Sequence, residues 1–489
     1  MAGIGFQLNR LFQKKGFLNL CRAYIFAGVI SIGPMILYVI MLLGITLVSF
    51  LSGMERPDQE VMNCMLTYNL LVSLLLSNCF NMVVTRFVAD HLYEGRYAEI
   101  MPSFYGSCCL QLLIIIPTYG TFLLMSGVPR SYVLMCLWIT SVMTVVWMEM
   151  IYLMILKDYR RIIAAFTISM MAGFLLALVL MLLQLITVTR LMGCVLLAFG
   201  LMVVWYHELL VGFFPRQKGS GFIFLQWFDR YRQLGIIGAA VWAGLYGHIC
   251  IMYFGPLNHQ TTGLFYMAPM YEIPALFAFF SIIITIISFV TSVEVKFFPK
   301  YQRYYSLFND RGSIIDIESA EKEMLDVLGQ ELLFMGIRQI IMTILFIVSG
   351  GFIMDLLPLG MIDLGKDIFR ILCVGYGIYA MANSVMLILL YFEDYVGAMT
   401  GVVLFSVISF GGTLLQMLFG KQVFYGMSFA IAALVFLLVA IIRLDWCSRN
   451  LQYLLLGRQE FLASEPRGFF IWLSGKLSGK EGQADGQKE

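Results

Sequence analysis

The sequence predicts an all-α polytopic membrane protein with twelve transmembrane helices in two six-helix bundles. Three observations support this fold class. Apolar and aromatic residues make up 60% of the 489 residues and charged residues only 13%, a balance that water-soluble domains do not show. Twelve segments are apolar over about 20 residues, the length that crosses the hydrocarbon core of a bilayer as a helix. The longest gap among the first seven of these segments separates six from six.

The chain is expected to begin with a cytoplasmic segment, residues 1–22, because this stretch lacks the apolar core and cleavage site of a signal peptide. The N-terminal lobe covers 23–214 and the C-terminal lobe covers 234–442, with an inter-lobe linker at 215–233 that holds Gly, Ser and four basic residues. Paired lobes of this kind are typical of transporters whose substrate site lies near the midplane. The predicted spans are 23–51, 61–84, 101–128, 131–156, 162–188, 191–214, 234–254, 273–293, 339–356, 368–391, 395–418 and 423–442.

The distribution of Lys and Arg predicts the orientation of the spans. The N-terminus, every second loop after it and the C-terminus together hold 26 of the 32 basic residues, and the other loops hold six. Basic residues are enriched on the cytoplasmic side of membrane proteins. We therefore expect both termini and the linker to lie in the cytoplasm.

The same topology places two longer segments in the cytoplasm. Residues 296–338 begin with basic residues and continue as an amphipathic helix over 313–332, which leads into the ninth span. Its apolar positions, Leu325 and Leu328 among them, would be uncovered in water, so we expect a cytosolic partner to dock there; the alternative is an ordinary solvated helix. Residues 443–489 are expected to form a helix, which can lie in the membrane plane, and then a disordered tail.

Catalytic and cofactor motifs are absent from the sequence. It has no Walker-type phosphate loop, no HExxH motif and no GxSxG motif. The ten cysteines are scattered through apolar runs without metal-ligand spacing, which favours small buried residues over a disulfide framework or a metal site. We therefore expect no enzyme activity, cofactor, metal or nucleic-acid partner in a chain surrounded by the lipid bilayer. The energy for transport would then come from a source other than nucleotide hydrolysis within this chain.

Three separated stretches carry a more specific signal than these counts. They are the opening MAGIGFQLNRLF, the segment MYEIPALFAFFSIIITIISFVTSVEVKFFPKYQRYY at 270–305, and GSIIDIESAEKEM at 312–324. In this order they resemble the PelG family, the polytopic membrane proteins of Pel exopolysaccharide systems, over nearly the whole chain. One departure is Gln7, which stands where we expect an acidic residue.

The resemblance implies membership of the multidrug/oligosaccharidyl-lipid/polysaccharide flippase superfamily, with the two six-helix bundles around a central cavity. It also implies export of a polymer rich in N-acetylgalactosamine across the bacterial inner membrane, for the matrix of a biofilm. The partners that it implies are the polysaccharide itself, the cytosolic Pel glycosyltransferase (PelF) and the membrane proteins PelD and PelE.

Glu149 is the main candidate for a functional residue. It lies in the run VVWMEMIYLMILKDYRR at 145–161, eight residues before Lys157, or about 12 Å along a helix. An ionised carboxylate that faces lipid there would cost several kcal/mol, so we expect Glu149 to face the bundle interior, find a partner or bind a proton. We predict a role on the central cavity in coupling or gating; a hydrogen-bonded structural glutamate is the alternative.

The seventh span carries an aromatic stripe. Trp242, Tyr246, Ile249 and Tyr253 follow helical spacing on one side, with His248 on the other. Aromatic faces can stack on sugar rings, so the stripe is a candidate for the path of the polymer, whereas packing or an interfacial belt is the alternative. His248 is a candidate proton relay or an interhelical hydrogen-bonding residue.

Proline near the middle of the first span makes this position a candidate gate or hinge. Gly33 and Pro34 would kink that helix, because proline removes a backbone donor; a static bend is the alternative. For the remaining charges near the predicted cytoplasmic face we expect solvation or ion pairing in preference to substrate contact: His207, Glu208, Arg338, Glu393 and Asp394.

Three functions fit the sequence. The leading hypothesis is a polysaccharide exporter or flippase, which rests mainly on the resemblance. The second is a cation-coupled exporter of small molecules with the same architecture. The third is a scaffold that gathers the subunits of a polysaccharide synthase.

Overall fold

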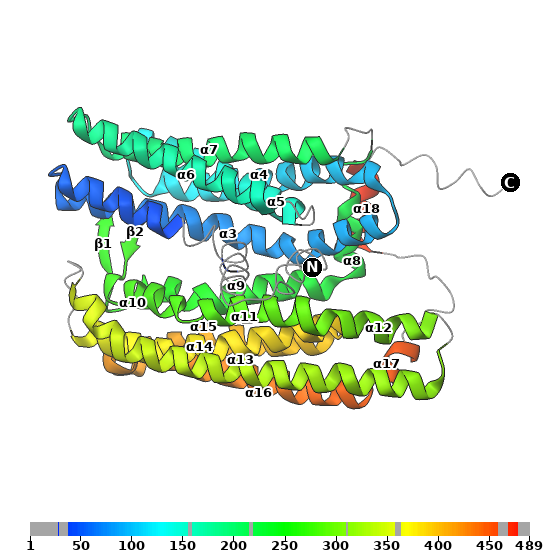
Figure 1. The fold of residues 1–489 in the computed structure, drawn as a ribbon. Coiled ribbons are helices and arrows are strands. Elements are labelled where there is room, and N and C mark those ends of the chain that lie inside the picture. Colours follow the sequence, from blue (N-terminus) through cyan, green and yellow to red (C-terminus); the bar gives the residue numbers. More distant parts are fainter. Residues whose placement is uncertain are drawn as a thin grey trace, which may run out of the picture. The chain divides into compact units, whose positions relative to one another are not determined.

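The computed structural model of the chain describes residues 28, 38–154, 159–214, 219–309, 312–356, 363–457 and 468–477, and these residues are almost entirely helical (Figure 1). The first helices are α3 (Arg56–Tyr93), η1 (Tyr97–Glu99), α4 (Ile100–Met125), α5 (Arg130–Met154), α6 (Tyr159–Leu182), α7 (Val188–Phe213), η2 (Ile223–Leu225), α8 (Gln226–Arg230) and α9 (Arg232–Met252). Two strands follow, β1 (His259–Thr262) and β2 (Phe265–Met267). The later helices are α10 (Pro269–Phe280), α11 (Ile283–Ser292), η3 (Val293–Phe297), α12 (Phe298–Asn309), α13 (Ile314–Leu356), α14 (Asp363–Tyr391), α15 (Tyr395–Phe419), η4 (Gln422–Phe424), α16 (Met427–Arg449), α17 (Leu451–Gly457) and α18 (Phe469–Leu477).

The helices confirm the predicted class of all-α polytopic membrane protein. Among the described residues, eleven helices are long and apolar enough to cross a membrane, and a shorter apolar helix covers Tyr38–Leu51. The eleven coincide with the second to twelfth predicted spans, and the shorter helix is the end of the first. Except for Gly28, residues 1–37 lie outside the described part of the chain.

The described residues divide into two compact units. The N-terminal unit contains Met35–Tyr246 and, from later in the chain, His259–Met267 and α18; the C-terminal unit contains Gly247–Asn258 and Ala268–Gln459. This division differs from the predicted one at 215–233, because the chain changes units inside α9, after Tyr246.

The linker belongs to the N-terminal unit because its described part, residues 219–233, packs on α3 and α4. A Cβ atom at Gly106 of α4 would lie only 1.9 Å from the carbonyl oxygen of Gly221, so the glycine at this position lets the two backbones touch. The Phe228 ring of α8 lies 5.2 Å from the Phe80 ring of α3 in an edge-to-face arrangement. The segment predicted as a spacer between lobes is therefore part of one folded unit.

The C-terminal residues form more helix than predicted. The last span, α16, continues to Arg449, and the predicted helix after it is the short α17. An unpredicted helix, α18, packs on α8: the Phe470 and Phe228 rings lie 5.4 Å apart, and the backbone N–H of Ile471 donates to the Asp229 carboxylate at 2.9 Å. The predicted disordered tail, 478–489, lies outside the described residues.

A small hairpin of β1 and β2 is a second unpredicted element. The strands pair antiparallel across a turn at Gly263, whose φ is +53°, a conformation that glycine adopts without strain. Phe265 is fully buried, with its ring 5.0 Å from that of Tyr68 and 5.5 Å from that of Phe122. The Tyr68 hydroxyl donates to the carbonyl oxygen of Tyr266 at 3.0 Å. A loop between the seventh and eighth spans is thereby fastened to α3 and α4.

The amphipathic stretch at 313–332 is the start of α13, a single helix of 43 residues. Its apolar face is covered by the chain itself: Met324 and Leu328 are buried in one cluster with Tyr304 of α12, Ile388 of α14 and Leu451 of α17. Leu325 packs against the same cluster. We predicted a docking partner at Leu325 and Leu328 because this face would otherwise be uncovered, and that premise is wrong.

Candidate functional site: a buried carboxylate in the N-terminal unit

Glu149 lies in the last turns of α5 and is fully buried in the N-terminal unit. Neither of its carboxylate oxygens has a hydrogen-bond partner among the described residues. An ionised carboxylate in such surroundings costs several kcal/mol, and buried polar groups in proteins are nearly always hydrogen-bonded to protein or water. Within the described part of this unit, Glu149 is thus a fully buried carboxylate that no hydrogen bond to the protein explains.

His207 of α7 is a titratable side chain that lies next to Glu149. Its Nδ1 atom lies 3.9 Å from Oε1 of Glu149, and its Nε2 atom lies 3.2 Å from the hydroxyl of Tyr105 on α4. The side chain of His207 is 32% exposed, and Tyr105 is exposed. The three residues therefore form a series of polar atoms from the exposed surface of this unit to a buried carboxylate. Glu149 does not line a solvent-accessible surface here, and its predicted action on a central cavity stays a prediction.

Other buried polar side chains lie close to this carboxylate. The Gln111 amide of α4 donates to the sulfur of Met148, the residue before Glu149, at 2.8 Å. The hydroxyl groups of Tyr152 on α5 and Ser103 on α4 form a hydrogen bond of 3.0 Å, and both side chains are fully buried. Polar atoms thus continue from Glu149 along the contact between α4 and α5.

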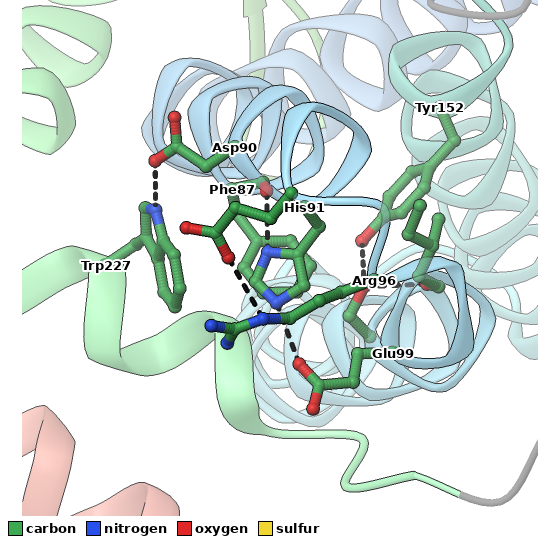
Figure 2. A network of polar contacts seen from close by, with 10 residues as sticks. Phe87, Asp90, His91, Arg96, Glu99, Tyr152 and Trp227 are labelled. Carbon is green, nitrogen blue, oxygen red and sulfur yellow. Dashed lines mark hydrogen bonds and ion pairs between the residues drawn. The ribbon is translucent and has the colours of Figure 1, made fainter.

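A second network lies at the end of α3 (Figure 2). Nδ1 of His91 lies 2.9 Å from the Phe87 carbonyl oxygen, and Nε2 lies 2.8 Å from the Glu99 carboxylate. Both partners are acceptors, so both contacts are hydrogen bonds when the imidazole carries two protons or when Glu99 is protonated. His91 is fully buried and its ring packs against Phe87 and Trp227, at 4.0 and 5.0 Å.

The same network holds the linker in place. Trp227 of α8 donates from Nε1 to the Asp90 carboxylate at 2.8 Å, and Asp90 also pairs with Arg86 one turn earlier, at 3.0 Å. Figure 2 shows Trp227 against the end of α3 and Glu99 approaching His91 from the start of α4. These contacts join α3, the loop after it and the linker, and they are the polar counterpart of the aromatic packing at Phe228.

The predicted aromatic stripe of the seventh span is divided between the two units. Trp242 and Tyr246 are half-buried in the N-terminal unit, with ring centroids 6.0 Å apart. Tyr253 lies just after the end of α9 in the C-terminal unit, where it is buried and donates to Glu272 at 3.0 Å. His248 is fully buried in the C-terminal unit, 2.7 Å from the Tyr271 hydroxyl. Roles for these residues in the polymer path or in proton relay stay predictions.

Several of the predicted solvated or paired charges have partners in their own units. In the C-terminal unit, the Asp394 carboxylate accepts two hydrogen bonds from Arg443, at 2.5 and 3.0 Å. Burial alone would raise the pKa of Asp394, but the hydrogen bond and charge of Arg443 outweigh it and hold the pKa below its usual range. Arg338 donates to Ser288 at 3.3 Å. The hinge candidates Gly33 and Pro34 lie outside the described residues.

Sequence reasoning missed how the buried polar residues are combined. It assigned His207 to a solvated or paired charge without linking it to Glu149, and it passed over Tyr105 and Gln111. The available signal was the placement of polar residues within the second to fourth spans, where no loop or cap explains them. Within the part of the chain that the structure describes, no cluster of His, Cys, Asp and Glu is suited to a metal ion.

Comparison with known proteins gives the following similarities. The sequence model of the family described as "PelG: Putative exopolysaccharide Exporter (EPS-E)" matches residues 1–455. No curated protein matches the chain. Among solved structures, MATE in the straight conformation has a TM-score of 0.60 at 9% identity, covering 88% of this chain and 96% of that chain. A MOP superfamily transporter from Pyrococcus furiosus Vc1 (DSM3638) has a TM-score of 0.58 at 10% identity, covering 88% and 96%. The eukaryotic MATE transporter AtDTX14 has a TM-score of 0.58 at 12% identity, covering 95% and 100%.

Proposed function

The chain belongs to the PelG family of exopolysaccharide exporters, and from this membership we propose that it carries a Pel-type polysaccharide, rich in N-acetylgalactosamine, outward across the bacterial inner membrane for the matrix of a biofilm. The family match over residues 1–455 carries this proposal, because it includes every candidate span of the structure. The fold supports it, since the similar solved structures are membrane transporters.

Glu149 and His207 are proposed as the pair that couples or gates this export. A polymer that crosses before deacetylation is neutral, so a carboxylate is not needed to attract it. A proton is a better partner for Glu149, because the carboxylate is fully buried and His207 connects it with the exposed Tyr105. Uptake and release of a proton there would change the charge inside the N-terminal unit, which is a means to bias its conformation.

The proposed setting places both termini in the cytoplasm, because basic residues are concentrated in the N-terminus, the C-terminus and alternate loops. The polymer would reach the chain from the cytosolic glycosyltransferase PelF, with PelD and PelE as membrane partners. The apolar face of α13 is not offered as their docking site, since it is covered within the C-terminal unit.

Reconstitution of the full chain in vesicles with the cytosolic glycosyltransferase tests the export function. Polymer is assayed on each side of the membrane, and we expect it in the compartment opposite the enzyme only when this chain is present. Equal crossing without the chain would remove the exporter function and leave a scaffold role.

The same vesicles test Glu149. Glu149→Gln keeps the shape of the side chain and its hydrogen bonding but cannot ionise, whereas Glu149→Leu loses both. Loss of export in both variants at equal expression indicates that the charge or proton is required; loss with Leu alone indicates a hydrogen-bonding role. Glu208→Gln, which neutralises the exposed carboxylate next to His207, is the matched control and should export normally. Full export by Glu149→Leu would contradict the coupling role.

A cation-coupled exporter of small molecules is the second candidate. Two of the similar structures bear the description of multidrug resistance transporters of the MATE family, and a buried carboxylate fits ion coupling on either hypothesis. This candidate requires that the purified chain transports organic cations when a proton gradient is imposed as the energy source. The glycosyltransferase is absent from this assay.

A further inference from the structure

The core of the N-terminal unit contains a continuous series of buried polar side chains. On α3 they recur at every turn, at Asn69, Ser73 and Ser77, and all three are at least 96% buried. Spacing of four residues places them on one face of the helix. Small polar residues are common between packed membrane helices, so this series alone is explained by helix contact. Helix contact does not explain why this series leads to Glu149 or why some of its polar atoms have no hydrogen-bond partner among the described residues.

The partners of α3 extend the series to α4 and α5. The Tyr119 hydroxyl of α4 donates to Asn69 at 2.8 Å, and the indole N–H of Trp147 on α5 donates to Ser73 at 3.1 Å. Ser77 lies 3.5 Å from the amide oxygen of Gln111. Gln111 in turn donates to the residue before Glu149. Successive turns of α3 therefore make polar contacts with α4 and α5, and these contacts reach the residue next to Glu149.

The series continues past Glu149 to the other end of the helices. Tyr152 and Ser103 share a hydrogen bond, and Ser107, one turn along α4 from Ser103, is also fully buried. From Tyr119 to Ser103 the series covers 16 residues of α4, or about 24 Å at 1.5 Å per residue. The hydrocarbon core of a bilayer is about 30 Å thick. The polar column therefore runs along most of the membrane thickness.

Several atoms along this column have no hydrogen-bond partner among the described residues. They are Nδ2 of Asn69, the hydroxyl oxygen of Thr140 on α5, and both carboxylate oxygens of Glu149, and all three side chains are fully buried. Leaving a buried polar atom unpaired costs about 1–3 kcal/mol. Proteins satisfy such atoms with internal water, which makes about three hydrogen bonds to polar groups.

We propose that internal water molecules occupy this column between α3, α4 and α5 and connect the Glu149 carboxylate with the Asn69 and Tyr119 end of the helices. A hydrogen-bonded chain of water and side chains moves protons, so the column is the route by which a proton reaches Glu149 from the end opposite Tyr105. The transport role of this route rests on the proposed function, whereas the hydration of the column does not.

Hydroxyl-radical labelling of the full chain in lipid nanodiscs tests the hydration. Radicals made by a pulse of X-rays from water inside the protein oxidise side chains beside that water. Met148 accepts from Gln111 in the column, and Met192 of α7 is equally buried outside it. We expect oxidation of Met148 to be several-fold faster than that of Met192. Equal protection of the two methionines would overturn the proposal.

Variants locate the water. Gln111→Leu removes the polar groups next to Met148 and should reduce its oxidation to the level of Met192. If that variant does not fold, Ser77→Ala, which removes only the hydroxyl beside Gln111, takes its place. Ser169→Ala deletes a buried hydroxyl on α6 that also lacks a described partner but lies outside the column, and it should leave oxidation of Met148 unchanged. Unchanged oxidation in the column variants would also overturn the proposal.

Proton flux separates this inference from the proposed function. In vesicles with an imposed pH gradient and a trapped pH-sensitive dye, Gln111→Leu should slow proton entry relative to the wild type. A hydrated column with normal export in the Glu149 variants keeps the inference and removes the coupling role. A column without water, together with failed export in the Glu149 variants, removes the inference and keeps the coupling role.

Discussion

Replacing Asp394 tests how much one buried ion pair contributes to the stability of the C-terminal unit. Asp394 lies between α14 and α15, is fully buried, and binds Arg443 through both carboxylate oxygens. One of these oxygens also accepts from the backbone N–H of Gly397 at 3.3 Å, which caps α15. The residue therefore combines an ion pair and a helix cap in one carboxylate.

The expected loss follows from these two contacts. Removing one partner of a buried pair costs about 3–5 kcal/mol, and because Arg443 keeps 32% of its side chain exposed we expect the lower end, about 3 kcal/mol. Loss of the cap adds about 1 kcal/mol, so Asp394→Ala should lower the free energy of unfolding by about 4 kcal/mol. Asp394→Asn keeps the cap and one hydrogen bond to Arg443, each worth about 1 kcal/mol, and should cost about 2 kcal/mol.

Reversible unfolding in detergent micelles measures these differences. Asp367→Asn is the matched control, since Asp367 pairs with Arg370 at 2.9 Å on an exposed surface and such pairs contribute about 0–1 kcal/mol. Because the pKa of Asp394 is lowered in the folded state, its stabilisation is present above the unfolded pKa of about 3.9 and is lost as the pH falls through the folded pKa. A loss in Asp394→Ala no larger than that in Asp367→Asn, or one that persists undiminished at low pH, would refute this reasoning.

Three further predictions concern the linker, the α13 face and the topology. Gly106→Ala should detach the linker from α4 and expose it to limited proteolysis, because the new Cβ atom would meet the Gly221 carbonyl oxygen; Gly200→Ala on α7, where nothing lies within 4 Å, should leave the cleavage pattern unchanged. Leu328→Ala should reduce the free energy of unfolding by about 2–5 kcal/mol, since Leu328 is buried in the cluster of α12, α13 and α17; an unaffected stability would mean that this face is uncovered in solution. Reporter fusions after Arg190 and after Glu489 should report opposite sides of the membrane, and the same side for both would contradict the predicted topology.

The sequence by itself determined the class of the fold and the positions of the membrane helices that the structure describes. Composition and the length of apolar runs identify membrane-spanning helices without reference to any contact, because each helix satisfies its own backbone hydrogen bonds in lipid. Eleven predicted spans are present as helices of the structure. The sequence also identified Glu149 as a carboxylate with no local partner, since its neighbours along one helix can be read from spacing alone.

Only the tertiary structure decided which surfaces meet. Periodicity showed that one face of 313–332 is apolar but not that α12, α14 and α17 cover it, and it showed that 215–233 has a linker's composition but not that Gly106 admits its backbone. His207 approaches Glu149 to within 3.9 Å, although it lies on another helix and its distance from Glu149 along the chain carries no spatial information. Helix periodicity fixes only which side chains share a face, whereas the neighbour of each face depends on how helices far apart in the sequence pack.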